Sequence, residues 1–440
     1  MNRDLLPKLL AWKRQPSRKP LLIDGARQTG KTYLLTRLLG QEFQAVHHYD
    51  FLSNPSLGDA FEGALTPQTV LSNLELISER RIDPKRDLLV FDEIGECPRA
   101  VTALKYFAEQ APSLFVAASG SNIGLLGSFP VGKVEQHILR PLSFHEFLQA
   151  LEQPALLHAF ENRAHHKAAH EKLLAQLLNY TFTGGMPEAV QAWVDLADQG
   201  ILAQTQKVRQ IHGDLVAGYG RDFGKYAGAT DAGIIAAIFE AVPSQLSAVL
   251  DESVQRFKFK NVHPKKARYS DLEGGISWLE KCRLVLKNYP LEGRPRSPLA
   301  AQRKVNRVKL FLHDVGLLTH MLGLGYREIQ EQRFEYKGYV AENFVAQELA
   351  AAGLDPTYSW TDARAEIEFI ATDQEGKVIP LEVKSGRRTR ARSLQSFVTK
   401  CQPDKTIKLT GTQGSPATET RHLVYPLYFT AAALQDHGLA

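Results

Sequence analysis

Residues 25–32 constrain this chain more than any other segment, because they fit the pattern G-x-x-x-x-G-K-S/T at each fixed position. The segment comprises Gly25, Ala26, Arg27, Gln28, Thr29, Gly30, Lys31 and Thr32. An apolar run at 20–24 predicts a buried strand before it. A helical pattern at 31–39 follows and ends at Gly40, which we expect to be a left-handed cap. Strand, loop and helix in this order predict a phosphate-binding loop in a parallel α/β sheet. The alternative is a strand-to-helix turn that binds no ligand.

The residue types in this loop suit the binding of a nucleoside triphosphate. The glycines let the backbone N–H groups point at the phosphates, and the helix N-terminus adds positive potential. Lys31 would neutralise phosphate charge, and the Thr32 hydroxyl would bind Mg²⁺. A second apolar strand, within 87–93, brings Asp92 to its C-terminal end, where open α/β sheets bind ligands. We expect Asp92 to bind Mg²⁺, directly or through water, and Glu93 to polarise the water that attacks the γ-phosphate. The sequence therefore predicts binding and hydrolysis of ATP.

The order of elements in residues 1–150 resembles that of the AAA+ and related ATPases. A strand candidate at 45–51 lies between the loop and Asp92, and a catalytic Glu follows Asp92 directly. The resemblance implies a three-layer ATPase domain with a polar γ-phosphate sensor after the strand at 114–118. Ser121 or Ser119 would fill that role, and we favour Ser121. A serine-rich loop without this role is the structural alternative.

The resemblance also raises the question of an arginine that acts on a neighbouring subunit. Related chains carry Gly-Arg shortly after the sensor loop, whereas this chain has Gly132 and Lys133. Lysine lacks the bidentate fork of arginine, so Arg140 is the candidate substitute. A homo-oligomer remains open.

The middle of the chain is helical and then strongly basic. We expect a helical region over 151–242 and a winged-helix region over 243–333, because helical patterns at 243–257 and 269–286 precede strand-like segments. Residues 251–310 contain fifteen Lys or Arg and six Asp or Glu, a net charge of +9, although the whole chain carries +5. This excess favours nucleic-acid binding through phosphate contacts. The alternatives are a solvated basic face and a winged helix that contacts protein.

Four short stretches resemble bacterial and archaeal AAA+ proteins in which this kind of ATPase precedes domain of unknown function 4143. They are Gly184-Gly-Met-Pro-Glu188, Tyr219-Gly-Arg-Asp222, Pro298-Leu-Ala300 and Phe311-Leu-His-Asp314-Val-Gly-Leu-Leu318. Together with the ATPase region and the tail, the resemblance spans nearly the whole chain. It implies nothing about the chemistry of the middle region.

Acidic residues and one lysine recur at regular positions in the C-terminal region, 334–440. They are Glu342 in a helical pattern, Glu366 and Glu368 on one strand candidate, and Glu382 and Lys384 on the next. Because strand side chains alternate, Glu382 and Lys384 share one face, as do Glu366 and Glu368. Carboxylates that converge from adjacent strands form a site for Mg²⁺ or Mn²⁺, and a nearby lysine can orient the attacking water.

This pattern resembles the PD-(D/E)xK nuclease core, including its helix-borne acid. The resemblance implies a site made of Glu342, Glu368, Glu382 and Lys384, and the arginines within 384–392 suit a phosphate backbone. Glu368 stands where the pattern usually has Asp, so its carboxylate lies one methylene further out, whereas metal–oxygen distances tolerate about ±0.2 Å. Two hypotheses stay open: an ATP-governed machine that acts on nucleic acid, and an ATP-switched binding module with an inactive nuclease-like tail.

Composition excludes several other classes of protein. Hydrophobic residues at 44% and charged residues at 23% exclude a disordered or fibrous chain. The three cysteines, Cys97, Cys282 and Cys401, are far apart and predict neither a zinc site nor a disulfide framework. We predict a cytoplasmic, soluble protein with no membrane partner, because neither a signal peptide nor an 18-residue apolar run is present. His47 and His48 are expected to be surface or packing residues.

Overall fold

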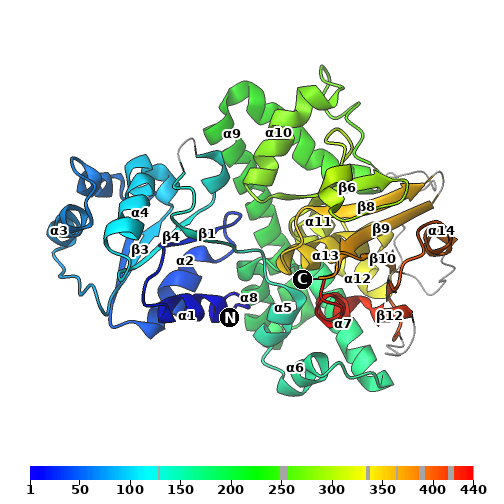
Figure 1. Cartoon of the computed structure of the whole chain (residues 1–440). Helices are drawn as coiled ribbons and strands as arrows, with labels where there is room; N and C mark the ends of the chain where they lie inside the picture. The colour runs from blue at the N-terminus through cyan, green and yellow to red at the C-terminus, as the bar shows by residue number, and fades with distance from the viewer. Residues whose placement is uncertain are drawn as a thin grey trace. The chain divides into compact units, whose positions relative to one another are not determined.

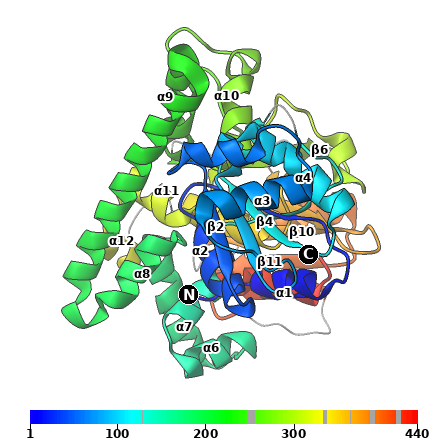
Figure 2. The same ribbon diagram turned by 90° about the vertical axis from the view of Figure 1, so that its left-hand side faces the viewer.

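The computed structural model of the chain divides into two units by the contacts between its residues. Unit 1 consists of residues 1–140 and 281–283, and unit 2 of residues 141–280 and 284–440. The structure describes residues 1–126, 129–247, 256–332, 337–362, 365–385, 392–414 and 421–439. Figures 1 and 2 show the chain coloured from the N-terminus to the C-terminus. No helix within these ranges is long and apolar enough to cross a lipid bilayer.

Unit 1 is built on a five-stranded parallel sheet. Its strands are β1 (Leu21–Asp24), β2 (Val46–Asp50), β3 (Leu88–Asp92), β4 (Phe115–Gly120) and β5 (Glu135–Ile138). Their order across the sheet is β2-β3-β4-β1-β5, and each neighbouring pair is parallel. The strand that the sequence predicts at 45–51 is β2. Because β4 lies between β1 and β3, the ends of these three strands meet at one edge of the sheet.

Helices pack against this sheet and complete two hydrophobic cores. They are α1 (Leu6–Arg14), α2 (Lys31–Tyr33), η1 (Leu34–Leu39), η2 (Gly40–Glu42), η3 (Pro55–Phe61), α3 (Pro67–Ser78), η4 (Ile94–Glu96), α4 (Pro98–Gln110) and η5 (Ile123–Leu125). Alternate strand residues enter opposite cores: Leu22 packs with α3 and α4, and Leu21 and Ile23 pack with α1 and η1. This is the mixed α/β arrangement with a parallel sheet that the sequence predicts.

The helix that follows the phosphate-binding loop differs from the expected one. Its first turn, α2, continues as a π-helix, η1, and Gly40 has a right-handed φ of −59°. The prediction of a left-handed cap at Gly40 is therefore wrong. A Cβ atom at Gly40 would lie 2.8 Å from Val46 Cγ2, so the glycine is explained by the close approach of β2.

Unit 2 begins with a helical region, and further helices lie between and after its strands. The helices from residue 141 onwards are α5 (Phe144–Ala150), α6 (Pro154–Glu161), α7 (Lys167–Thr183), α8 (Pro187–Asp195), η6 (Ala197–Gln199), α9 (Ile201–Ser247), α10 (Tyr269–Lys281), η7 (Leu299–Gln302), α11 (Val315–Met321), α12 (Tyr326–Glu331), α13 (Lys337–Ala351), α14 (Arg392–Cys401), η8 (Leu427–Phe429) and α15 (Thr430–Asp436). The long green helix in Figure 2 is α9, which spans 47 residues and contains Pro243.

The second sheet belongs to unit 2 and has seven strands. They are β6 (Val285–Glu292), β7 (Lys309–Leu312), β8 (Thr357–Asp362), β9 (Ala365–Thr372), β10 (Val378–Lys384), β11 (Thr406–Thr410) and β12 (His422–Pro426). Their order is β12-β11-β10-β9-β8-β6-β7. The strands predicted near 357–360, 365–371, 378–385 and 406–410 correspond to β8, β9, β10 and β11.

The region expected to be a winged helix, 243–333, is organised differently. Its two strands, β6 and β7, are antiparallel neighbours in the seven-stranded sheet, where β6 pairs with β8. Residues 285–291 of β6 are all buried, whereas the wing of a winged helix is exposed to solvent. The expected helix at 243–257 begins within α9 and then enters residues outside the described ranges. The strands that sequence analysis assigned to a wing are thus part of the C-terminal sheet, and the boundary expected at 334 separates strands that pair.

Asp314 and its neighbour His313 connect three of the four family-like stretches within unit 2. Its carboxylate is fully buried and accepts hydrogen bonds from the backbone N–H groups of Gly185 (2.6 Å) and Leu317 (2.9 Å). The neighbouring His313 lies 3.5 Å from the hydroxyl of Tyr219. Gly184 has a φ of +69°, and a Cβ atom there would lie 2.2 Å from Asp314 Oδ1. These stretches therefore have a packing role.

Candidate functional site

The phosphate-binding loop of unit 1 runs from the end of β1 to the start of α2. Two of its residues, Gln28 and Gly30, have positive φ angles of 65° and 91°. A Cβ atom at Gly25 would lie 2.4 Å from the carbonyl oxygen of Leu139, which explains the first glycine of the pattern. Thr29 is fully buried, and its hydroxyl donates to Ala26 O at 2.9 Å. The loop is thus held in shape by its own backbone.

Lys31 is folded into this loop. Its side chain is 5% exposed, and its ammonium donates to the carbonyl oxygens of Gly25 (3.1 Å) and Ala26 (2.9 Å) and to Ser121 Oγ (2.9 Å). Burial lowers the pKa of Lys31, and the nearby Glu93 and other acidic residues oppose that effect. Three donor positions of a buried cation therefore point at oxygen atoms of the loop and of the end of β4.

Asp92 ends β3 and is surrounded by hydrogen-bonding groups. Thr32 Oγ1 donates to Asp92 Oδ2 at 2.5 Å, Ser119 donates to Asp92 Oδ1, and His48 Nε2 lies 3.2 Å from Oδ2. Burial raises the pKa of Asp92, but the hydrogen bonds from His48, Ser119 and Thr32 together lower it to about 2. Asp92 is consequently an anion at neutral pH. The structure brings it together with Thr32, as the sequence predicts for a magnesium site.

Glu93 is held by the residue that the sequence favours as the sensor. Ser121 Oγ donates to Glu93 Oε1 at 2.9 Å, and the Ser121 backbone N–H donates to Oε2 at 3.2 Å. Glu93 also has a φ of +46°, a left-handed conformation that costs a non-glycine residue about 1–3 kcal/mol. A chain of contacts therefore joins Lys31, Ser121 and Glu93. The other candidate, Ser119, contacts Asp92 instead.

His48 is a site residue that sequence analysis missed. It lies on β2, is 36% exposed and contacts Asp92, and hydrogen bonding to Asp92 raises its pKa. Its neighbour His47 is buried and pairs with Asp87 at 3.0 Å. The only signal in the sequence was the position of the pair on a strand next to the one that carries Asp92.

The two residues considered for the role of the trans-acting arginine are Arg140, which is buried, and Lys133, which forms an ion pair. Arg140 is 7% exposed, and its carbonyl oxygen accepts a hydrogen bond from Arg3. The guanidinium of Arg140 is thus buried within this chain, and its role towards a neighbouring subunit stays a prediction. Lys133 is exposed and pairs with Glu109 at 2.8 Å.

A cluster of four carboxylates and two lysines lies in the second sheet and α13 of unit 2. Lys384 on β10 lies 3.0 Å from Glu368 Oε1 and 3.4 Å from Glu382 Oε1. Lys309 on β7 pairs with Glu342 of α13 and lies 3.7 Å from Glu366 Oε1. The structure therefore brings together all the nuclease-like residues that the sequence predicts. It adds Lys309, a lysine within an apolar strand that the sequence analysis did not single out.

Burial raises the pKa of two carboxylates in this cluster, and the neighbouring lysines oppose that effect. Glu382 is 0% exposed, and burial raises its pKa, while Lys384 opposes that effect. Burial likewise raises the pKa of Glu342, against the influence of Lys309. Across the described ranges, no group of three or more His, Cys, Asp or Glu side chains has an arrangement that could hold a metal ion. In the cluster, the lysines already lie between the carboxylates.

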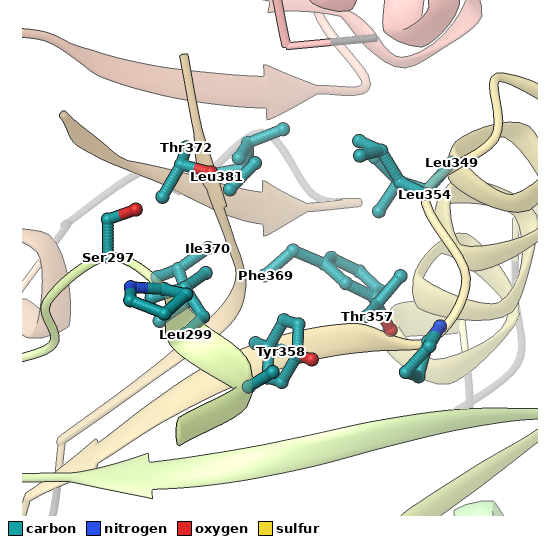
Figure 3. A pocket seen from close by; sticks show the side chains of 14 residues that line it. Ser297, Leu299, Leu349, Leu354, Thr357, Tyr358, Phe369, Ile370, Thr372 and Leu381 are labelled. Carbon is teal, nitrogen blue, oxygen red and sulfur yellow. The ribbon is translucent and has the colours of Figure 1, made fainter. Parts of the chain in front are cut away.

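Unit 2 also contains an apolar pocket of about 240 Å³. Figure 3 shows side chains that line it, among them Leu299, Leu349, Tyr358 and Phe369. Its lining residues carry no charged side chain, so the pocket does not suit a phosphate-bearing ligand.

The basic residues of 251–310 are mostly at the surface where the structure describes them. The exposed ones in unit 2 are Arg256, Lys258, Lys260, Lys265, Arg268, Arg294, Arg296, Arg303 and Lys304. Two others, Lys287 and Lys309, are buried and paired with acids. In the second basic segment, 384–392, residues 386–391 lie outside the described ranges and Arg392 is exposed.

Family comparisons divide the chain into three matched segments. A family described as AAA domain matches residues 17–148. Two families of unknown function, DUF8612 and DUF4143, match residues 174–328 and 337–429. Residues 17–148 thus match an AAA domain, and residues 337–429 match a DUF4143 domain. The expected AAA and DUF4143 domains are both found, although the four quoted stretches lie within the DUF8612 match. The nuclease resemblance stays a prediction.

Comparisons with characterised proteins add little. No curated protein matches the chain. Among solved structures, one described as Drosophila ORC bound to DNA is similar at 11% sequence identity, over 73% of this chain and 85% of that chain. Its TM-score is 0.23, and a likeness at that level carries no argument.

We predict that Lys309→Met lowers the free energy of unfolding by about 3 kcal/mol, because Glu342 then loses its partner in the interior. Burial raises the pKa of Glu342, so its carboxyl group binds a proton more tightly in the folded variant than in the unfolded chain. The loss should therefore be smaller at about pH 5 and grow towards about pH 8 in urea unfolding.

The matched control is Lys304→Met, which breaks an exposed pair with Glu292 and should cost less than about 1 kcal/mol at either pH. Equal losses in the two variants would show that Lys309 is not a structural partner of Glu342.

Proposed function

We propose that the AAA domain of this chain binds ATP together with Mg²⁺ and hydrolyses it. The observation that carries the proposal is the buried ammonium of Lys31, which lies inside a preformed loop at a helix N-terminus. A buried cation at such a position favours an anionic ligand, because backbone N–H groups and the helix dipole reinforce its charge. The match to an AAA domain supports a nucleotide as that ligand.

Thr32 and Asp92 have the donor set that Mg²⁺ requires. Their hydroxyl and carboxylate oxygens lie 2.5 Å apart, and Asp92 is ionised at neutral pH. Hard oxygen donors of this kind, completed by phosphate oxygens and water, suit octahedral Mg²⁺. When bound, the ion neutralises charge that develops on the phosphates. His48 holds the Asp92 carboxylate from the β2 side.

The chain of contacts from Lys31 to Glu93 gives the ligand a way to control the catalytic carboxylate. A γ-phosphate that binds the Lys31 ammonium competes with the hydrogen bond from Lys31 to Ser121 Oγ. Ser121 then turns towards the phosphate oxygen, and the carboxylate of Glu93 is released from the serine hydroxyl. A free Glu93 accepts a proton from the water that attacks the phosphate. Ser121 thereby acts as the sensor and as the residue that restrains the base.

The exposed basic residues of 256–304 support nucleic-acid binding by unit 2. Their charge suits phosphate groups, since residues 251–310 have a net charge of +9. Binding of this kind weakens steeply as the salt concentration rises, because the release of counterions from the nucleic acid then contributes less free energy. We propose that ATP turnover is coupled to this binding.

For the C-terminal domain we propose the second hypothesis, a nuclease-like tail that does not cut. The specific observation is Lys309, whose buried ammonium pairs with Glu342 and lies 3.7 Å from Glu366 Oε1. Its positive charge lies among the carboxylates that would have to bind a metal ion in a nuclease site. A cation that enters must displace a buried ion pair, which costs several kcal/mol, about 3–5 by analogy with other proteins.

We predict that Lys31→Ala and Glu93→Gln each reduce steady-state ATP turnover by at least about 100-fold, but through different steps. Lys31→Ala removes the phosphate-binding cation and should also abolish nucleotide binding. Glu93→Gln removes the base and should retain binding. Phosphate release and binding of a fluorescent ATP analogue separate the two effects.

Lys85→Ala, an exposed lysine of unit 1, serves as the control and should keep full turnover. Turnover that survives in both site variants would contradict the proposed ATPase.

We predict that the wild type binds single- or double-stranded nucleic acid in a salt-dependent manner but does not cleave it with Mg²⁺ or Mn²⁺, with or without ATP. The reason is that Lys309 already pairs with the carboxylates of the cluster. A gel assay of labelled DNA and RNA measures both properties. Cleavage by the wild type that disappears in Lys384→Ala would instead establish an active nuclease.

A further inference from the structure

A tripeptide from the second half of the chain, Lys281–Arg283, belongs to the nucleotide-binding unit. Its neighbours in sequence, the rest of α10 and β6, belong to unit 2. Cys282 Sγ lies 3.3 Å from Asn122 Oδ1, one residue after Ser121. A Cβ atom at Gly124 would lie 3.0 Å from Lys281 Cβ, so the two backbones are in close contact. The tripeptide therefore packs against the segment that follows the sensor serine.

The third residue of the tripeptide, Arg283, reaches the residue that precedes the phosphate-binding loop. Its Nε and Nη2 atoms both donate to Asp24 Oδ2, at 2.9 Å and 2.7 Å. The Asp24 side chain is 0% exposed, whereas the Arg283 side chain is 21% exposed. Two donors on one buried carboxylate oxygen make a charge-assisted, directional pair.

Asp24 needs such a partner because of its position. It is the last residue of β1, it is followed directly by Gly25, and its carbonyl oxygen accepts a hydrogen bond from Leu139 N–H at 2.7 Å. Its carboxylate acts electrostatically on Lys31, since it opposes the lowering of the Lys31 pKa by burial. An unneutralised carboxylate at this place would repel a triphosphate and attract the lysine that must bind it.

The backbone of Arg283 shows that this contact is maintained at a cost. Its φ is +63°, a left-handed conformation that non-glycine residues rarely adopt. Strain of this kind persists only where surrounding interactions determine the conformation, and it concentrates at functional positions. At Arg283, the two hydrogen bonds to Asp24 are such interactions.

We propose that Arg283 is a positioning residue of the nucleotide site, which neutralises Asp24 and thereby leaves Lys31 available for the phosphates of ATP. The proposal rests on the proposed ATP-binding function and deepens it. It also makes the turn between α10 and β6 part of the ATP site, so that the site is completed by residues beyond the AAA domain match at 17–148.

The test is a rescue experiment on the full-length protein. Arg283→Met removes the charge and the donors, and Asp24→Asn in the same chain removes the carboxylate that needs them. Arg283→Lys keeps the charge without the bidentate fork. Arg327→Met is the matched control, because Arg327 is 89% exposed and pairs with Glu331 at 2.7 Å in α12.

Binding of a fluorescent ATP analogue with Mg²⁺, KM and kcat are measured for each variant. Arg283→Met should weaken binding and raise KM at least about tenfold, with a smaller effect on kcat. The double variant Asp24→Asn/Arg283→Met should return to within about threefold of the wild type, because no buried charge is left unpaired. Arg283→Lys should fall between them, and Arg327→Met should match the wild type.

Two results would overturn the proposal while leaving the ATPase intact. One is an Arg283→Met variant that binds ATP as Arg327→Met does. The other is a double variant that is folded by circular dichroism but binds the analogue at least about tenfold more weakly than the wild type does. This second result decides the question if Arg283→Met alone does not fold. A wild type that does not bind the analogue would instead refute the proposed function and this inference with it.

Discussion

The burial of the Lys31 ammonium is the interaction on which the rest of unit 1 depends. A lysine charge in the interior is costly, and this one is stabilised by two loop carbonyls and the Ser121 hydroxyl. Those oxygens come from the end of β1 and the end of β4. They can meet because β4 lies between β1 and β3 in a parallel sheet. The fold thus gathers the Lys31 ammonium, Ser121 and Glu93 at one edge, where we propose that the nucleotide binds.

Local sequence patterns predicted the elements of the chain well. The phosphate-binding loop, the strand that carries Asp92 and strands β8 to β11 follow from apolar runs and turn residues, which depend on neighbours in sequence. The partners of β6 and β7 do not. A short apolar strand can pair in a wing or in a larger sheet. The choice between these two pairings depends on β8, which is far away in sequence and pairs with β6 in the folded chain. The helix after the loop was predicted, but its π-helical form and the role of Gly40 depend on Val46, which approaches from β2.

The candidate sites show the same limit. Thr32, Asp92 and Glu93 could be predicted, because each occupies a fixed place in a local pattern. His48, Lys309 and Arg283 could not, since each meets its carboxylate partner only through the tertiary fold. All three are cations or hydrogen-bond donors that neutralise a buried acid. A buried Asp or Glu in a predicted strand is therefore a signal that a distant donor exists, although its identity is not encoded locally.

The most direct test of the account is a calorimetric titration of the wild type with a non-hydrolysable ATP analogue, with Mg²⁺ and again with a chelator. The account predicts saturable binding that Mg²⁺ tightens, because Thr32 and Asp92 contribute only through the ion. It also predicts that ADP binds more weakly than the analogue, since Lys31 and Ser121 respond to the γ-phosphate. Absence of binding, or binding that is indifferent to both Mg²⁺ and the γ-phosphate, would contradict it.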